Sequence, residues 1–308
     1  MEIPLTMNIA SFVPLLLALV LSPLLPGVIN RTKALFAGRR GQPLLQTYFD
    51  LWKLLRKGAV YSRTTTWVFR AGPIIGLAAM LTAAMLMPLG NVPALIAFPL
   101  DLLLFAGLLG VVRFFIVVAA LDTGSSFEGM GASREVFFSA LAEPALLAAL
   151  VTLARQADSL SLSTMFGPVS GMHWLHSGPL LALVVIALMI VLLAENARIP
   201  VDDPNTHLEL TMIHEVMVLD HGGPDFAFIL YSAALKLWLF AALIVGMVLP
   251  DTGNVWVNIL LAAGGMLVVA VVVGVIESIM ARLRLVIVPQ LLVGAGALAA
   301  VAFLLGLA

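Results

Sequence analysis

Four ionisable side chains lie inside long apolar stretches of the sequence: Arg113, Glu143, Lys236 and Glu277. A charge at the centre of a membrane helix costs about 2.5–3.5 kcal/mol on insertion scales, so it usually has a partner or a function. Two interpretations are open. The charges can pair internally, for example Glu143 with Arg113 or Lys236, and lock helices together. Alternatively they form a protonatable chain, in which Glu143 is helped by Pro144, which loosens the helix and frees a backbone carbonyl.

The densest acidic group follows one of these stretches. Its carboxylates are Glu195, Asp202, Asp203, Glu209, Glu215, Asp220 and Asp225, with Arg198 as the one arginine. Thr206 and Glu209 have capping-box spacing, which predicts a helix beginning after Asp203-Pro204. Leu208, Met212, Glu215 and Leu219 would share one face of that helix, so Glu215 would lie in an apolar stripe. The segment is either an acidic cytosolic loop or, as we favour, a funnel of acidic groups leading into the bilayer.

The histidines of this segment do not have the spacing of a metal site. His207, His214 and His221 are seven residues apart, roughly 10 Å along a helix and too far for one ion. His214-Glu215 begins a zincin-like pattern, but its second histidine would fall at Val218. We therefore expect no metal in this chain.

Composition identifies the elements that must position these residues. Of the 308 residues 62% are hydrophobic and only 11% are charged, too little charge to cover a soluble globule. Apolar runs near the ~20 residues that cross a bilayer recur along the chain. We predict an all-α, polytopic membrane protein of about eight transmembrane helices, near 8–29, 70–89, 95–121, 136–154, 179–195, 226–249, 255–279 and 286–306. Because the first run has no basic n-region and no cleavage site, we expect an uncleaved span.

Charge along the chain predicts the orientation. Nine Lys and Arg residues against one Asp lie in the segment 31–70, which the positive-inside rule places in the cytoplasm. Alternating spans then give a single membrane domain, 1–308, in the inner (cytoplasmic) membrane. Its cytoplasmic loops are about 30–69, 122–135, 197–225 and 280–285, and both termini lie outside. The segment 46–57 reads as a short amphipathic helix with Trp52 facing lipid or core.

The basic segment has two open interpretations: an orientation signal that contacts lipid headgroups, or a docking surface for a soluble partner. Arg39 and Arg40, in the predicted turn 38–43, together with Arg134 and Glu135 in a later inner loop, are the candidate docking residues. Cysteine is absent, so thiolate-held metals and iron–sulfur clusters are excluded from this chain, and any redox centre must lie on a partner.

Several motifs resemble the membrane subunit of formate hydrogenlyase and hydrogenase-4-type complexes, which is homologous to subunit 1 of respiratory complex I. They are Gly38-Arg-Arg-Gly41, Arg113-Phe-Phe, Leu121-Asp-Thr-Gly-Ser125, Gly131-Ala-Ser-Arg-Glu135, Glu143-Pro144 and Ala281-Arg-Leu-Arg-Leu285. The resemblance covers essentially the whole chain. It departs near Glu195-x-x-Arg198-Ile-Pro-Val-Asp202, where the family usually has Lys for Arg198 and Phe for Val201, and again at His214-Glu215-Val-Met.

The resemblance implies a subunit that links a soluble hydrogenase-like or dehydrogenase-like arm to antiporter-like membrane subunits. Iron–sulfur clusters and a nickel–iron site would belong to partners, and quinone is a possible ligand. An acidic channel would be lined by Glu195, Asp202, Asp203, Glu209 and Glu215, with Glu143 deeper in it. We expect a lipid-embedded, non-catalytic coupling subunit that binds no nucleic acid.

Two other functions are kept as alternatives. A quinone-reactive complex I-type subunit would be lined by ordinary apolar residues, which the sequence does not distinguish. A stand-alone secondary ion transporter would show inverted repeats, and the two halves of this chain differ in charge pattern and loop length.

Overall fold

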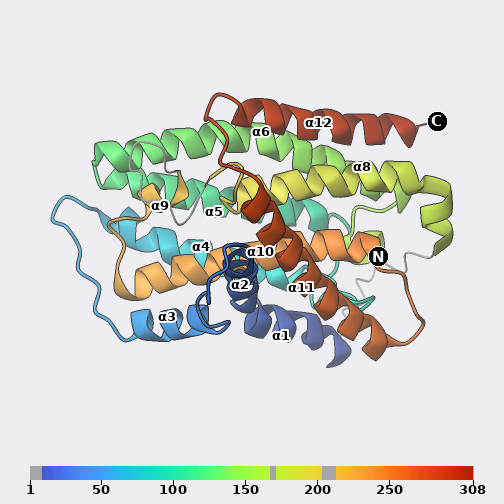
Figure 1. The fold of residues 1–308 in the computed structure, drawn as a ribbon, viewed down its shortest axis with the longest axis horizontal. Helices are drawn as coiled ribbons and strands as arrows, with labels where there is room; N and C mark the ends of the chain where they lie inside the picture. Colours follow the sequence, from blue (N-terminus) through green and yellow to red (C-terminus); the bar gives the residue numbers. More distant parts are fainter. Residues whose placement is uncertain (1–8, 167–170, 203–212, 308) are drawn as a thin grey trace.

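The computed structural model describes residues 9–166, 171–202 and 213–307, and 73% of the chain is helical (Figure 1). Seven helices are long and apolar enough to cross a membrane. They are α4 (Trp67–Met85), α5 (Asp101–Asp122), α6 (Ser126–Gln156), α8 (Gly171–Glu195), α10 (Gly223–Val248), α11 (Val255–Ile279) and α12 (Val288–Leu305). A bent helix pair at the N-terminal end raises the number to eight if it counts as one span. The predicted all-α membrane fold is confirmed.

The bent pair replaces the continuous first helix expected over 8–29. A short 3-10 turn (Ile9–Ser11) leads into α1 (Phe12–Leu21), and α2 (Leu24–Phe36) follows at an angle of 46°. The break falls at Ser22 and Pro23, where a proline cannot donate the helical N–H bond. As a result α2 extends to Phe36 and carries Lys33 within a helix rather than in the expected loop.

The cytoplasmic loop expected at 122–135 is much shorter in the structure. Only Thr123, Gly124 and Ser125 separate α5 from α6, and α6 runs for 31 residues. Gly124 adopts a left-handed φ of +71°, which suits glycine, and the Thr123 hydroxyl donates to Ala120 O while accepting from Ser125 N–H. Arg134 and Glu135 therefore lie on a helix that continues into the membrane.

The helix expected after the capping box is also different. Thr206, Glu209 and the rest of 203–212 lie outside the described residues. Downstream, α9 is a single turn, His214–Met217, and the chain is not helical again before α10 begins at Gly223. Leu219 is exposed. The predicted apolar stripe through Glu215 thus does not reach Leu219 as one helix.

Close packing at the centre is built around α10 and around glycines. Every residue of α10 from 237 to 245 is buried. On α4, a Cβ at Gly72 would lie 2.9 Å from the Ala119 side chain of α5, so only glycine permits this approach. Gly274 of α11 has the same role against Thr32 of α2, at 2.7 Å. Small residues allow membrane helices to approach in this way.

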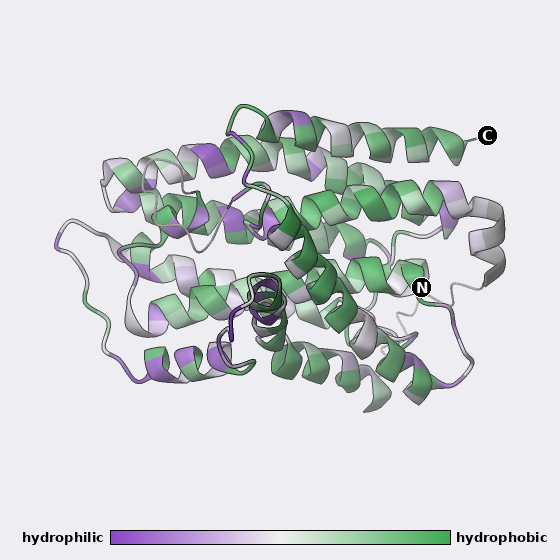
Figure 2. Cartoon of the chain, in the orientation of Figure 1, coloured by the Kyte–Doolittle hydropathy of each residue, from purple (hydrophilic) through white to green (hydrophobic). Residues whose placement is uncertain are grey.

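Two short helices lie outside the main bundle. α3 (Gln46–Leu55) contains no buried residue and exposes Phe49, Trp52 and Leu55, as an amphipathic helix at a membrane surface would. α7 (Leu162–Met165) caps the opposite end of the molecule. Hydrophobic residues dominate the long helices, while hydrophilic residues gather around α3, the neighbouring loops and the centre of the bundle (Figure 2).

Candidate functional site

Arg113, on α5, is the centre of a cluster of charges inside the bundle. Its Nη2 lies 2.5 Å from Glu195 Oε1 at the end of α8, and its Nη1 pairs with Glu143 on α6. Its Nε lies 3.9 Å from Oε1 of Glu135, which precedes Glu143 on α6. Two helices, α6 and α8, thus direct three carboxylates at one guanidinium. The structure contains the internal pairing of Glu143 with Arg113, which was one of the two open interpretations.

Lys236 adds a second cation to this cluster from α10. Its Nζ lies 2.7 Å from Glu195 Oε2, so the Glu195 carboxylate is held between Arg113 and Lys236. The Glu195 side chain is only 2% exposed. With three carboxylates against two cations, the cluster has one carboxylate in excess.

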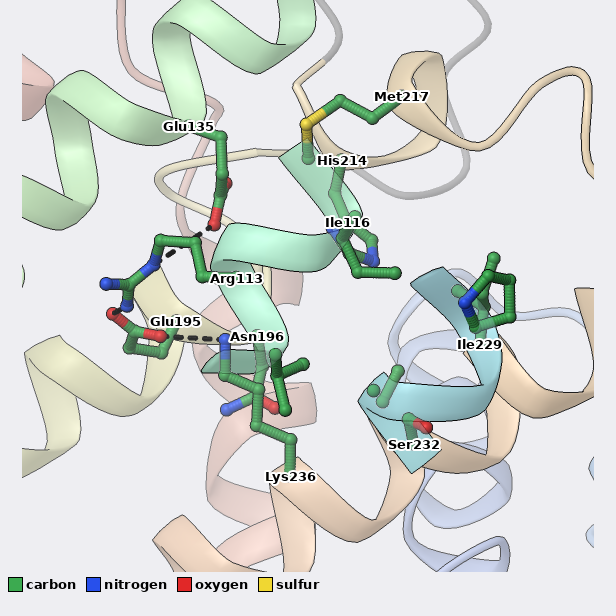
Figure 3. Close-up of a pocket in the computed structure, with 14 residues that line it drawn as sticks. Arg113, Ile116, Glu135, Glu195, Asn196, His214, Met217, Ile229, Ser232 and Lys236 are labelled. Carbon is green, nitrogen blue, oxygen red and sulfur yellow. Dashed lines mark hydrogen bonds and ion pairs between the residues drawn. The ribbon is translucent and has the colours of Figure 1, made fainter. Parts of the chain in front are cut away.

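A cavity of about 70 Å³ opens beside these charges (Figure 3). Its polar lining comes from Arg113, Glu135, Glu195, Asn196, His214, Ser232 and Lys236, and its apolar lining includes Ile116, Met217 and Ile229. A site needs roughly 10–15 Å³ and two to four polar partners for each water, so the space suits several waters. The cavity can therefore hold a hydrogen-bonded path between the carboxylates.

His214, on the α9 turn, lines this cavity. Its backbone N–H and that of Ile213 donate to Asp202 Oδ2, at 3.3 and 3.1 Å, which fixes the start of the turn. Burial, and then the charge of Lys236, lower the pKa of His214 to about 4. Near neutral pH it is thus an uncharged imidazole that can both donate and accept hydrogen bonds.

A second charge cluster lies nearer the α2–α11 contact. Glu277 on α11 has a fully buried side chain, with Lys33 Nζ 2.7 Å from Oε2 and Arg198 Nη1 3.5 Å from Oε1. The close approach at Gly274, one turn before Glu277, brings α2 and its Lys33 within reach. Arg282 Nη2 pairs with Asp202 Oδ1 at 2.7 Å, joining the segment after α11 to the segment after α8.

The other predicted residues fall in several places. Glu215 lies on the α9 turn and is half-buried, while Asp203 and Glu209 lie outside the described residues. Arg39 and Arg40 are exposed on the turn after α2, as a docking surface requires. Glu135, a candidate docking residue, faces Arg113 and lines the cavity instead.

The motifs that carry the resemblance build this architecture. Asp122 accepts hydrogen bonds from Thr66 N–H and Oγ1, at 2.6 and 2.9 Å, and so joins the α5–α6 turn to the start of α4. A Cβ on Gly131 would lie 2.8 Å from Ile213 O, so this glycine lets the α9 region pack directly on α6. These residues hold Glu135, His214 and Arg113 around the same cavity.

Lys33, Arg198 and Arg282 are site residues that sequence reasoning did not assign. Each was visible as a basic residue on the inner side, and positive-inside statistics explained it sufficiently. Lys33 is separated from Glu277 by most of the chain, so spacing carried no signal of the pair. The glycines at the helix contacts were the sequence feature that could have indicated which helices pack together.

Three sequence comparisons find relatives over most of this chain. The profile of the family described as NADH dehydrogenase matches residues 8–307. Formate hydrogenlyase subunit 4 of Escherichia coli (strain K12) is 32% identical over 289 residues, covering 90% of this chain and 92% of that protein. Hydrogenase-4 component C of the same organism is 32% identical over 232 residues, covering 75% and 72%.

Among solved structures, one chain of the membrane-bound sulfane sulfur reductase, an archaeal respiratory membrane complex, has the same fold. The TM-score is 0.82 with 20% sequence identity, and the alignment covers 97% of this chain and 98% of that one.

Proposed function

This chain belongs to the NADH dehydrogenase family, and on that premise we propose that it is a membrane subunit of an energy-converting hydrogenase-like or complex I-like assembly. Its role there is to couple redox chemistry on a soluble arm to ion translocation through the bilayer. The observation that carries this proposal is the cluster of Arg113, Lys236 and three carboxylates beside a polar cavity inside the bundle.

The excess carboxylate gives the cluster its proposed mechanism. Glu195 bridges Arg113 and Lys236, so a proton arriving at Glu195 weakens two ion pairs at once. Arg113, which already pairs with Glu143, can then draw closer to Glu135, 3.9 Å from its Nε, and this passes the electrostatic change along α6. Negative charge that appears on a partner near the α9 turn favours proton uptake by these carboxylates, because opposite charges attract more strongly away from water.

The exposure of Glu143 supports a further part of the proposal, that another membrane subunit covers this chain. Its side chain is 46% exposed although it lies well inside the membrane-spanning part of α6. A carboxylate facing lipid tails is strongly disfavoured. Phe137, on the same helix, and Phe114, next to Arg113 on α5, are also exposed. We propose that an antiporter-like subunit packs on the α5–α6 face and supplies a polar group to Glu143.

The soluble arm is proposed to dock at the opposite, basic side. The turn with Arg39 and Arg40 and the segment 218–222 after α9 would contribute to that surface, and iron–sulfur clusters and a nickel–iron site would belong to the arm. In this orientation loop 31–69 is cytoplasmic and both termini lie outside. Reporter fusions at residues 45 and 308 should therefore give opposite orientations, and matching orientations would contradict the eight-span topology.

The proposal is tested by purifying the tagged chain with its partners and assaying redox-linked ion translocation. Glu143→Gln should leave the complex assembled but lower translocation by about tenfold, since glutamine keeps the hydrogen bonds without carrying the proton. Arg39→Glu combined with Arg40→Glu should release the soluble arm and leave the membrane subunits together. Arg284→Gln, at an exposed arginine, is the control for loss of a surface charge. Normal translocation in Glu143→Gln would refute the relay.

A further inference from the structure

An open groove of about 940 Å³ lies at the end of the bundle away from the basic loop. The end of α6, the end of α12, the segment 97–100 and the α7 region form its walls, near the C-terminus in Figure 1. Phe98, Leu100, Val151 and Phe303 make most of its surface apolar. Its size is within the ~300–1,000 Å³ of small-molecule sites. It lies where the helices end, and thus where lipid headgroups meet acyl chains.

One wall of the groove is held in place from within the protein. The buried Asp101 carboxylate accepts the Ser161 hydroxyl at 2.9 Å and the Leu162 N–H at 2.6 Å. The Ser163 hydroxyl accepts Ala94 N–H at 3.0 Å, which joins the same wall to the segment before α5. The groove is therefore preformed, with fixed walls.

The groove contains one side chain of each charge. Among the described residues that line the groove, Arg155 is the one basic side chain and Asp158 the one acidic side chain. Its guanidinium lies 5.7 Å from the centre of the Phe303 ring, so the arginine lies along the groove wall. Asp158 follows just after α6, where its N–H donates to Arg155 O at 3.2 Å. Both side chains are exposed, and neither has an ion-pair partner among the described residues.

We propose that this groove binds a diacyl phospholipid with a zwitterionic phosphoethanolamine headgroup, in the leaflet opposite the basic loop. The phosphate pairs with Arg155 and the primary ammonium with Asp158, while an acyl chain lies against Val151 and Phe303. A headgroup with phosphate alone would leave the Asp158 carboxylate facing another negative charge. A lipid with no charged group in its headgroup would leave both Arg155 and Asp158 without partners in a region of reduced water.

The test uses the purified full chain in mild detergent and native mass spectrometry. Dioleoyl lipids with ethanolamine, glycerol or choline phosphate headgroups are added in equal amounts, and retained lipid is counted per protein. We expect the ethanolamine lipid to be retained at least fivefold over the other two. Asp158→Asn should remove its preference over the glycerol lipid. Arg155→Gln should lower retention of all three, and Arg284→Gln at the other end should change nothing.

Two further variants keep the test decisive. Val151→Trp fills the groove without touching either charge, so it should lower retention about as much as Arg155→Gln while the thermal transition stays within a few degrees. The chain has no cysteine, so Thr164→Cys places a single benzophenone crosslinker at the groove in the assembled complex. Crosslinking to phospholipid supports the proposal. Crosslinking to a protein subunit, or equal retention of all lipids in the unaltered chain, overturns it.

Discussion

Glu195 and Glu277 are both buried carboxylates held between two cations, yet their surroundings differ. Around Glu195, the partner Arg113 also reaches Glu135 and Glu143, and a polar cavity lies beside the group. Around Glu277, Lys33 and Arg198 have no second carboxylate among the described ion pairs. The first cluster has excess negative charge and the second has excess positive charge.

This difference separates a place where charge can move from a place where it is fixed. Adding a proton to the Glu195 cluster leaves both cations with other carboxylates nearby, so the electrostatic cost of neutralising one carboxylate is reduced. Adding a proton to Glu277 leaves two cations with no counter-charge in a water-poor site, which is strongly disfavoured. We therefore interpret Glu277 as a structural clamp between α2, α11 and the segment after α8.

Glu277→Gln is expected to have the largest effect on folding. It leaves Lys33 and Arg198 without their carboxylate, and breaking a buried pair costs about 3–5 kcal/mol. Membrane yield and the thermal transition in detergent should both fall sharply. Glu195→Gln is the matched change in the other cluster and should be tolerated better, because Arg113 keeps Glu135 and Glu143. Equal loss of stability in the two variants would remove the distinction between clamp and relay.

Mild acid should weaken the cavity cluster through His214. Its pKa is lowered to about 4 in the folded chain, against 6.5 for the free side chain, because burial and Lys236 disfavour the charged form. The unfolded chain binds the extra proton first, so this contribution to stability is complete above pH 6.5. It is lost as the pH falls towards 4, by up to about 3 kcal/mol.

Thermal unfolding measured between pH 7.5 and 4 in matched buffers tests this pH dependence. His214→Gln should flatten the curve in that window. Burial also lowers the pKa of His221, which is stacked on Phe69 away from the cavity, to about 4, so His221→Gln should remove a separate part of the pH dependence and leave the His214 part unchanged. A pH curve that His214→Gln does not alter would place the acid sensitivity elsewhere.

Lys33→Gln should have a smaller effect on stability than either Glu277→Gln or acid acting through His214. The Lys33 side chain is 22% exposed, so it is only partly withdrawn from water, and without it Arg198 still pairs with Glu277. We expect a loss of about 1 kcal/mol, typical of one hydrogen bond with partial solvation. The equivalent change in the other cluster, Lys236→Gln, should instead lower ion translocation. Ion-flux measurements on the same preparations would separate this effect from an effect on stability.

Hydropathy was enough to predict the spans but not their breaks. Pro14, Pro23 and Pro26 all lie in one apolar run, and each is compatible with a straight helix start or a bend, so the 46° angle could not be predicted. The polar residues of 122–135, Arg134 and Glu135 among them, are typical of a loop by hydropathy, although they also tolerate helix at the end of a span. Tertiary contacts at Gly131 decide between the two.

The candidate site was predictable by residue type and not by pairing. Arg113, Glu143 and Lys236 stand out because charges in apolar runs need explanations, and all three meet in one cluster. The choice between Arg113 and Lys236 as the partner of Glu143 depends on how their helices are rotated relative to one another. The 3.6-residue period within each helix does not determine this relative rotation. The pairing of Glu277 with Lys33 depends on the α2–α11 contact and on the bend before it.

The three-residue connection between α5 and α6 also bears on how the chain enters the membrane. Synthesis delivers Arg113 before any of its carboxylate partners, and a lone arginine at that depth costs about 2.5–3.5 kcal/mol on insertion scales. Because only Thr123, Gly124 and Ser125 separate the two helices, Glu135 and Glu143 follow at once on the next helix. We expect α5 and α6 to leave the translocation channel together as a neutralised hairpin, so that lengthening this turn would delay biogenesis before it altered the finished protein.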